Sequence, residues 1–220
     1  MVIESLLNFL FPPRCPGCHS YVPEKGGWCT TCLEKTLQPH RLPLPAEPDP
    51  GLDAAWAIGQ YHGGLRELIR RLKYRRQRSA LPYIDEFLQR ADQRGSLDAI
   101  LQRTELAIPV PLHEEKQRQR GFNQAELIFQ AWALRHTLPM QTLLYRQRAT
   151  LPQYGLKVHQ RRDNMKGAFC LIDSTGIIGR HILLLDDILT TGSTLYACAE
   201  PLYKAGAASV AALVLASDRR

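Results

Sequence analysis

The chain has 220 residues, of which 45% are hydrophobic and 22% are charged, and its formal net charge is +7. This composition excludes a disordered tail or a fibrous repeat, and the length leaves room for one α/β core with a small additional module. The first apolar stretch, residues 6–11, is too short to span a bilayer and follows Glu4 instead of a basic region. We therefore expect a soluble, cytoplasmic protein with no membrane insertion.

Four cysteines near the N-terminus form two Cys-x-x-Cys pairs, Cys15 with Cys18 and Cys29 with Cys32. Two such turns facing each other give the closed, four-thiolate shell that structural zinc prefers. Two disulfides are one alternative, which the expected lack of an export signal disfavours, and a redox-active pair is another, which lacks a thioredoxin-like strand and helix. We predict a Zn²⁺ module over residues 1–40 that serves folding and not chemistry.

Five prolines between residues 39 and 51 mark the first domain boundary. That density cannot sustain a helix or a central strand, so it predicts an extended linker over residues 41–52. The second domain then covers residues 53–220. It should open with a strand at 53–60, an amphipathic helix and a second helix at 80–94, the apolar stripe of the first helix being Leu65, Leu68, Ile69 and Leu72.

Strands alternate with helices from residue 106 onward. The pattern first predicts a strand at 106–111, a polar loop at 113–121 and a helix at 123–137 capped by Asn123. Short strands follow at 142–145 and 168–172. The strongest strand is predicted at 181–185, followed by a helix at 192–205 and a last strand at 208–215. Continuous apolar strands separated by helices indicate a parallel sheet covered on both faces. Pro201 predicts a kink or an early helix end near Glu200, and Gly206 is expected to terminate that helix.

Positive charge gathers in two windows. Residues 66–78 carry seven basic side chains against Glu67, and residues 146–166 carry six against Asp163. Two local basic surfaces favour a polyanionic ligand, and phosphates are the common kind. Either run taken alone could instead be a solvated face of a helix or loop.

The most informative segment joins the strongest strand to its helix. Asp186 and Asp187 stand where ligands bind in open α/β sheets, and the turn at residues 190–194 offers backbone N–H groups, hydroxyls and a helix N-terminus to one anion. Two carboxylates beside a monophosphate site describe a ribose 5-phosphate. In the alternative interpretation, both acids merely cap a hydrophilic turn. The segment has neither a P-loop lysine nor a Gly-x-Gly-x-x-Gly pattern.

Residues 182–194 resemble the signature of the type I phosphoribosyltransferases, a hydrophobic strand with two acids and a Thr-Thr-Gly-x-Thr turn. The likeness narrows to the ComF family of competence proteins (ComFC/GntX-like) through the cysteine pairs and three further motifs, Tyr61-His62-Gly63 with Leu72-Lys73-Tyr74, Pro109-Val110-Pro111-Leu112, and Arg120-Gly121-Phe122-Asn123-Gln124. The resemblance covers nearly the whole chain. It implies a type I phosphoribosyltransferase-like α/β fold, a parallel sheet flanked by helices, behind a zinc-ribbon-like module.

The resemblance also implies binding of phosphoribosyl pyrophosphate (PRPP) together with Mg²⁺. The 5-phosphate would lie on Thr190, Thr191, Gly192, Ser193 and Thr194, and the ribose hydroxyls on Asp186 and Asp187. The loop with Leu112, His113 and residues 118–121 would face the pyrophosphate, and a mobile loop at 146–166 would bring Arg148 and Arg161 to the leaving group. Displacement at C1 of the ribose needs no covalent protein nucleophile. The acceptor stays open, because no residue identifies a base-reading pocket.

The resemblance also raises a second hypothesis, a single-stranded-DNA-binding accessory protein of transformation with no transferase activity, working with the DNA-uptake machinery. Phosphate contacts would supply most of the affinity. The residues expected to make them are Arg70, Arg71, Lys73, Arg75 and Arg76, with Tyr61, Tyr74 or Tyr154 as stacking platforms. Tyrosines near arginines are more often packing residues. Both hypotheses hold if the sugar-phosphate pocket regulates DNA handling.

Overall fold

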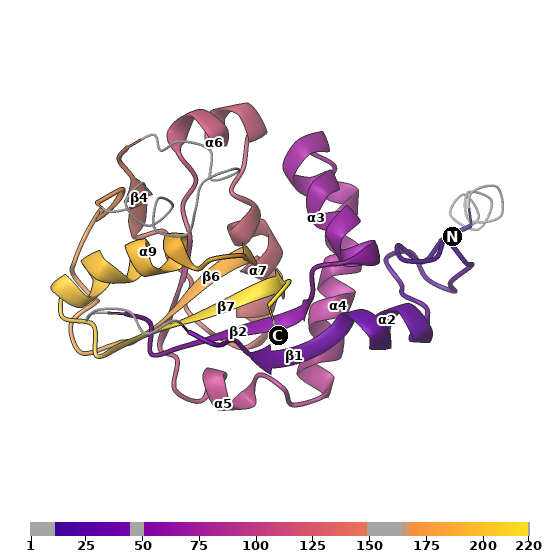
Figure 1. Ribbon diagram of the computed structural model, residues 1–220, viewed down its shortest axis with the longest axis horizontal. Helices are drawn as coiled ribbons and strands as arrows, with labels where there is room; N and C mark the ends of the chain where they lie inside the picture. The colour runs from indigo at the N-terminus through magenta and orange to yellow at the C-terminus, as the bar shows by residue number, and fades with distance from the viewer. Residues whose placement is uncertain (1–11, 45–50, 149–164, 166, 220) are drawn as a thin grey trace.

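A computed structural model describes residues 12–44, 51–148, 165 and 167–219 of the chain. Its centre is a five-stranded sheet in the order β1-β2-β7-β6-β3 (Figure 1). The strands are β1 (Leu37–Arg41), β2 (Ala54–Gln60), β3 (Leu106–Pro109), β6 (His181–Leu189) and β7 (Ser209–Ser217). β1 pairs antiparallel to β2, and the other neighbours are parallel. The predicted parallel α/β sheet is confirmed.

Helices lie on both faces of this sheet (Figure 1). They are α2 (Thr30–Thr36), α3 (Gly63–Arg75), α4 (Leu81–Gln93), α5 (Asp98–Leu101), α6 (Glu114–Arg120), α7 (Gln124–Arg135) and α9 (Ser193–Lys204), with the 3-10 turn η1 (Arg78–Ala80) before α4. A two-stranded sheet of β4 (Leu144–Arg146) and β5 (Phe169–Leu171) lies beside α9. Among the described residues, no helix has the length and apolar character needed to cross a membrane.

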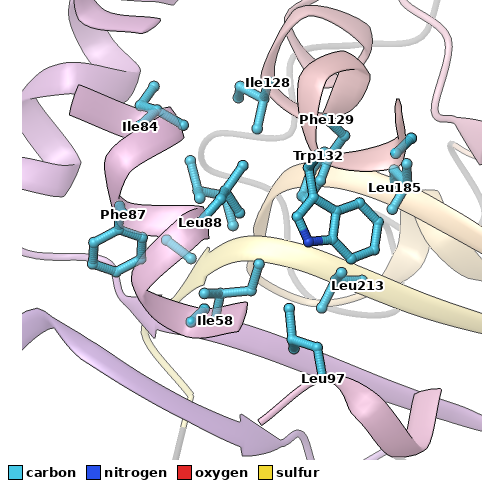
Figure 2. Close-up of a cluster of buried hydrophobic side chains, with 14 of the residues drawn as sticks. Ile58, Ile84, Phe87, Leu88, Leu97, Ile128, Phe129, Trp132, Leu185 and Leu213 are labelled. Carbon is cyan, nitrogen blue, oxygen red and sulfur yellow. The ribbon is translucent and has the colours of Figure 1, made fainter. Parts of the chain in front are cut away.

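The two faces of the sheet bury separate cores, because alternate residues of a strand point to opposite sides. On one face, Leu185 and Leu213 pack with Phe87, Phe129 and Trp132 from α4 and α7 (Figure 2). On the other face, a second cluster of buried apolar residues lies between the sheet and α9. It includes Ile182, Leu184 and Val214 from the strands and Leu195, Cys198 and Leu202 from α9. Burial on both sides explains why β6 and β7 appear in the sequence as continuous apolar runs.

The polar segment at 113–121, predicted to be a loop, is the helix α6. His113 caps it, since its Nδ1 accepts a hydrogen bond from the Glu115 N–H at 3.4 Å, and Gly121 ends it with φ +79°. No residue of α6 is buried. Its Glu, Lys, Gln and Arg residues favour helices intrinsically, but a helix without a buried residue shows no apolar periodicity, so the loop prediction was wrong.

The helix α9 does not end near Glu200, which was one of the two outcomes predicted for Pro201. It continues through Pro201 to Lys204, and Gly206 follows it with φ +89°. Pro201 lies in the last turn of α9, where it removes one N–H, and the Pro201 carbonyl still accepts from the Ala205 N–H at 3.1 Å. The prediction of Gly206 as the terminating residue is confirmed, because glycine adopts this left-handed conformation without steric cost.

The strand β1 joins the main sheet within the segment assigned to the first module. Its pairing with β2 shifts register between Leu37 and His40, so Pro39 sits at an irregularity of an edge strand, where a missing N–H is tolerated. The chain therefore enters the sheet of the larger domain before the proline-rich segment begins. The boundaries 1–40, 41–52 and 53–220 stay a prediction.

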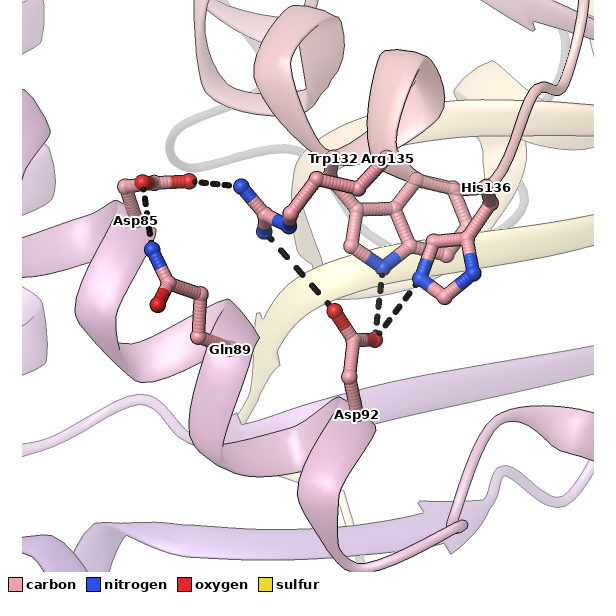
Figure 3. Close-up of polar contacts among 6 residues, drawn as sticks. All are labelled: Asp85, Gln89, Asp92, Trp132, Arg135 and His136. Atoms are coloured by element: carbon pink, nitrogen blue, oxygen red, sulfur yellow. Dashed lines mark hydrogen bonds and ion pairs between the residues drawn. The ribbon is translucent and has the colours of Figure 1, made fainter.

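A polar cluster joins α4 to α7 at the edge of the core that contains Phe87, Phe129 and Trp132 (Figure 3). Asp92 accepts from the indole N–H of Trp132 at 2.9 Å and lies 3.0 Å from Nε2 of His136, while Arg135 contacts Asp85 at 2.6 Å. Trp132 is fully buried, so its N–H has no access to water. Asp92 therefore satisfies a buried donor as well as linking two helices.

We predict that Asp92→Ala lowers the free energy of unfolding by about 1–3 kcal/mol, because it leaves the Trp132 N–H without an acceptor. Urea denaturation followed by circular dichroism measures the loss. Glu86→Ala is the matched control on α4, since it removes a surface pair with Arg90 (2.7 Å) that contributes about 0–1 kcal/mol. Equal losses in the two variants would contradict this role for Asp92.

Candidate functional site: an anion-binding cavity at the ends of the central strands

A cavity of about 300 Å³ opens at the carboxyl ends of β3 and β6. α3, α6 and the first turn of α9 surround it. The residues that line it are Lys73, Tyr74, Val110, Pro111, Leu112, Lys116, Arg120, Gln124, Arg146 and the continuous segment 186–195. Strands and helices that are far apart in the sequence therefore meet at one site.

The turn between β6 and α9 forms one wall of the cavity. All five residues predicted for the phosphate, Thr190 to Thr194, line it. Gly192 precedes α9 with φ +86°, and a Cβ atom there would lie 3.1 Å from the Tyr196 ring, so glycine suits both the backbone and the space. The hydroxyls of Thr191 and Ser193 lie 3.0 Å apart. The turn presents hydroxyls and a helix N-terminus to the cavity.

Asp186 and Asp187 stand directly before this turn, and their environments differ. Asp187 is buried, with Oδ1 2.8 Å from Nζ of Lys73. Its Oδ2 is also buried and has no hydrogen-bond donor among the described residues. Asp186 is half-buried, and its Oδ1 accepts from the Asp187 N–H at 2.8 Å. One buried acceptor atom of this pair thus has no assigned donor among the described residues.

Lys73, which was predicted to contact DNA together with the arginines of the same run, lines the cavity. Its side chain is 18% exposed and pairs with Asp187. Burial acts to lower the pKa of Lys73, but the Asp187 carboxylate outweighs it and the pKa is raised, so the ammonium stays charged. The sequence indicated this location of Lys73. It follows Ile69 by four residues, so it lies beside the buried apolar stripe of α3.

Three further cations line the cavity: Lys116 and Arg120 from α6, and Arg146 from β4. The pKa of Lys116 is lowered by burial first and then by the charges of Arg146, Arg120 and Lys73. Arg120 donates to Oε1 of Gln124 at 2.7 Å, which fixes its position. Crowded cations whose charges disfavour one another indicate a site for an anion.

The other residues predicted to face the pyrophosphate do not all line the cavity. Leu112 lines the cavity. His113 does not, and its ring caps α6. Arg148 is exposed and outside the lining, whereas Arg161 lies outside the described residues. Lys116 and Arg146 were missed because the first was assigned to a loop and the second was one of six basic residues in a window without periodicity.

The four N-terminal cysteines form a separate site near the first turn of α3, away from the cavity. Their Sγ atoms all lie within 4.8 Å of one another, and those of Cys18 and Cys29 are 3.6 Å apart. A tetrahedral Zn²⁺ with Zn–S bonds of about 2.3 Å requires sulfurs about 3.8 Å apart, so the donor set fits this metal. A Cβ atom on Gly17 would lie 2.7 Å from Sγ of Cys32, which shows how closely the turn wraps the sulfurs.

Comparison with known families matches both parts of the chain. The double zinc ribbon domain matches residues 6–44, and the phosphoribosyl transferase domain matches residues 145–220. The fold, the cavity and these matches define a phosphoribosyltransferase-type α/β domain that follows a structural zinc ribbon.

Relatives match over most of the chain. It is 32% identical over 200 residues to Competence protein F of Haemophilus influenzae, covering 88% of this chain and 80% of that protein. It is 32% identical over 203 residues to the DNA utilization protein YhgH of Escherichia coli O157:H7, covering 90% and 80%. Competence protein ComFC of Bacillus subtilis is 30% identical over 111 residues, which are 49% of this chain and 42% of that protein. The chain belongs to the ComF family of competence proteins.

We predict about one zinc ion per chain in purified protein, measured by plasma mass spectrometry, because four thiolates form a closed site. Cys29→Ser should lower the zinc content and destabilise the fold, since binding and folding of such a site are coupled. Cys170→Ser is the control, because Cys170 lies on β5, outside the cysteine cluster, and should keep the metal. A folded, reduced protein without metal would reject the site.

The pH dependence of stability should report on Asp186. Burial, and then the neighbouring Asp187 carboxylate, raise the pKa of Asp186 to about 8 from an ordinary value of 3.8, with Lys73 opposing. The unfolded state loses this proton at lower pH than the folded state, so ionisation of Asp186 destabilises the fold as pH rises from about 4 to about 8.

We therefore expect Asp186→Asn to gain stability relative to the wild type as pH rises through this range. Chemical denaturation at mildly acidic and at mildly alkaline pH measures the difference between the two proteins. A difference that does not change with pH would show that Asp186 has the same pKa in both states.

Proposed function

We propose that the cavity binds PRPP together with Mg²⁺. The observation that carries this proposal is the meeting, in one cavity of about 300 Å³, of a hydroxyl-rich turn, two adjacent carboxylates and four cations. A ligand that matches this set has a phosphate, vicinal hydroxyls and a second, more highly charged phosphate group. The family membership and the phosphoribosyl transferase domain favour the same ligand.

Each part of PRPP has complementary groups in the cavity. The 5-phosphate fits the turn from Thr190 to Thr194, where N–H groups and hydroxyls converge. The ribose hydroxyls fit Asp186 and Asp187, whose buried Oδ2 has no other donor among the described residues. The pyrophosphate fits the side formed by the three cations Lys116, Arg120 and Arg146. Arg148 and Arg161 stay candidates for further contacts to it.

If the protein transfers the phosphoribosyl group, the bond between C1 and the pyrophosphate oxygen breaks with its electron pair leaving on pyrophosphate. Mg²⁺ would neutralise part of that charge through phosphate oxygens and a carboxylate. The cations of α6 and β4 would stabilise the rest. Asp186 and Asp187 would hold the sugar while positive charge builds on the ring. No acceptor is assigned.

We expect Asp186→Asn combined with Asp187→Asn to abolish PRPP binding in isothermal titration calorimetry with Mg²⁺, because Asp187 loses its charge and each amide keeps only one acceptor oxygen for a ribose hydroxyl. Asp173→Asn is the matched control, since Asp173 is an exposed carboxylate that bonds the Thr175 N–H at 2.8 Å, outside the cavity. Undiminished PRPP binding by the double variant would defeat the proposal.

A second variant guards against misfolding of the first. Lys116→Gln changes an exposed helix and should weaken PRPP binding about 10-fold or more, the usual effect of losing a charged hydrogen bond. Binding of ribose 5-phosphate, which has no pyrophosphate, should change little. Equal losses for both ligands would place Lys116 elsewhere in the site.

A second candidate function is single-stranded DNA binding within the DNA-uptake machinery. Arg70, Arg75 and Arg76 are exposed on α3 and just after it, and Arg71 is half-exposed and paired with Glu67 at 3.1 Å. The names of the relatives, competence protein and DNA utilization protein, favour a link to DNA uptake. The substitutions of Asp186 and Asp187 should leave this DNA affinity intact.

A further inference from the structure

Tyr74 occupies an unusual position for an aromatic side chain. It is 73% exposed, yet it lines the cavity at the C-terminal end of α3, beside Lys73. The Arg120 guanidinium lies 5.9 Å from the centre of its ring. Burial of an aromatic ring stabilises a fold, so large aromatic side chains are usually buried. A ring that stays in water at the mouth of a charged cavity is available to stack on a ligand.

Cations continue the chain directly after this ring. Arg75, Arg76 and Arg78 are exposed. Arg76 has φ +52°, a left-handed conformation in which the chain turns away from α3 towards η1. Arg75 lies 3.9 Å from Glu67, whereas Arg76 and Arg78 form no ion pair within the described part of the chain. The ring therefore has neighbours suited to phosphates.

The other tyrosines considered for stacking do not share this position. Tyr61 is partly buried and packs against the core of the sheet. Tyr154 lies outside the described residues. Tyr21 is 65% exposed, but it belongs to the zinc ribbon and does not line the cavity. Tyr74 is thus the described tyrosine that combines exposure, neighbouring cations and the cavity mouth.

We propose that Tyr74 is the stacking platform for a base of single-stranded DNA at the mouth of the cavity, with Arg76 and Arg78 contacting the adjacent phosphates. This inference rests on the proposed DNA-binding function and names the place where it occurs. An unpaired base offers a flat face to the ring, which a base within a duplex cannot, and its flanking phosphates match the cations. The sugar-phosphate cavity and the DNA thus share one opening.

The test compares two fluorescent oligonucleotides of about 12 nucleotides, a length within the site size of single-strand binders. One contains thymine at every position, and the other has the same phosphates but abasic sugars. Fluorescence anisotropy gives the affinity of each for the wild type, Tyr74→Ala, Tyr74→Phe and the exposed control Tyr21→Ala. The loss of one stacked base should weaken binding of the thymine oligonucleotide by Tyr74→Ala about 5- to 150-fold.

The pattern across ligands separates the possible outcomes. Tyr74→Ala should bind the abasic oligonucleotide as the wild type does, because phosphate contacts do not depend on the ring. Tyr74→Phe and Tyr21→Ala should bind both oligonucleotides as the wild type does. Arg76→Gln with Arg78→Gln should weaken both oligonucleotides alike and reduce the salt dependence of binding.

Two results would overturn the inference. If Tyr74→Ala binds the thymine oligonucleotide as tightly as the wild type, the platform is elsewhere and the DNA-binding function survives. If the wild type binds neither oligonucleotide, the DNA-binding function and this inference fall together. Circular dichroism and the zinc content of Tyr74→Ala show separately that the variant is folded.

Discussion

The ion pair between Lys73 and Asp187 is the contact on which the cavity depends. It joins the last turns of α3 to the carboxyl end of β6 at 2.8 Å, with both side chains largely removed from water. A buried carboxylate without a partner is strongly unfavourable, so Asp187 keeps its position only while α3 stays in place. A pair of this kind adds little net stability, but removing one partner is costly. The role of the ion pair is to fix the position of α3 relative to the turn from Thr190 to Thr194.

The same helix connects the cavity to the zinc ribbon. At the first turn of α3, a Cβ atom on Gly64 would lie 2.7 Å from the Gly17 nitrogen, so the backbones of the helix and of a zinc-binding turn are in contact. Trp28 of the ribbon adds a hydrogen bond to the Tyr83 carbonyl at 2.9 Å and a ring contact to Phe87 at 5.5 Å. The metal thus supports the start of a helix whose other end carries Lys73 and Tyr74. A structural ion remote from the cavity contributes to its shape through one rigid element.

The features of the fold and the site that depend on residues close together in the chain could be predicted from the sequence. The apolar runs of β6 and β7, the Asn123 cap of α7, which bonds the Ala125 N–H at 3.0 Å, and the turn from Thr190 to Thr194 all depend on neighbouring residues. The cysteine cluster was predictable because two Cys-x-x-Cys pairs at this spacing are typical of a structural zinc site. Lys73, Lys116 and Arg146 were not assigned to the cavity, since their roles arise when three distant elements meet. Apart from Lys73, whose spacing from Ile69 indicated its place beside the buried stripe, a basic side chain that lines a cavity and one in open solvent look alike in a sequence.

The edges of the sheet have a consequence for the behaviour of the protein at high concentration. At one edge, β1 combines Pro39 with a shift in register. At the other, the short β3 exchanges hydrogen bonds with residues 139–141, the Ala107 N–H donating to the Pro139 carbonyl at 2.8 Å and the Gln141 N–H to the Ala107 carbonyl at 3.0 Å. Neither border therefore presents a long, regular row of free backbone groups to a second molecule. Intermolecular strand pairing, a common route to aggregation, is discouraged by the chain itself.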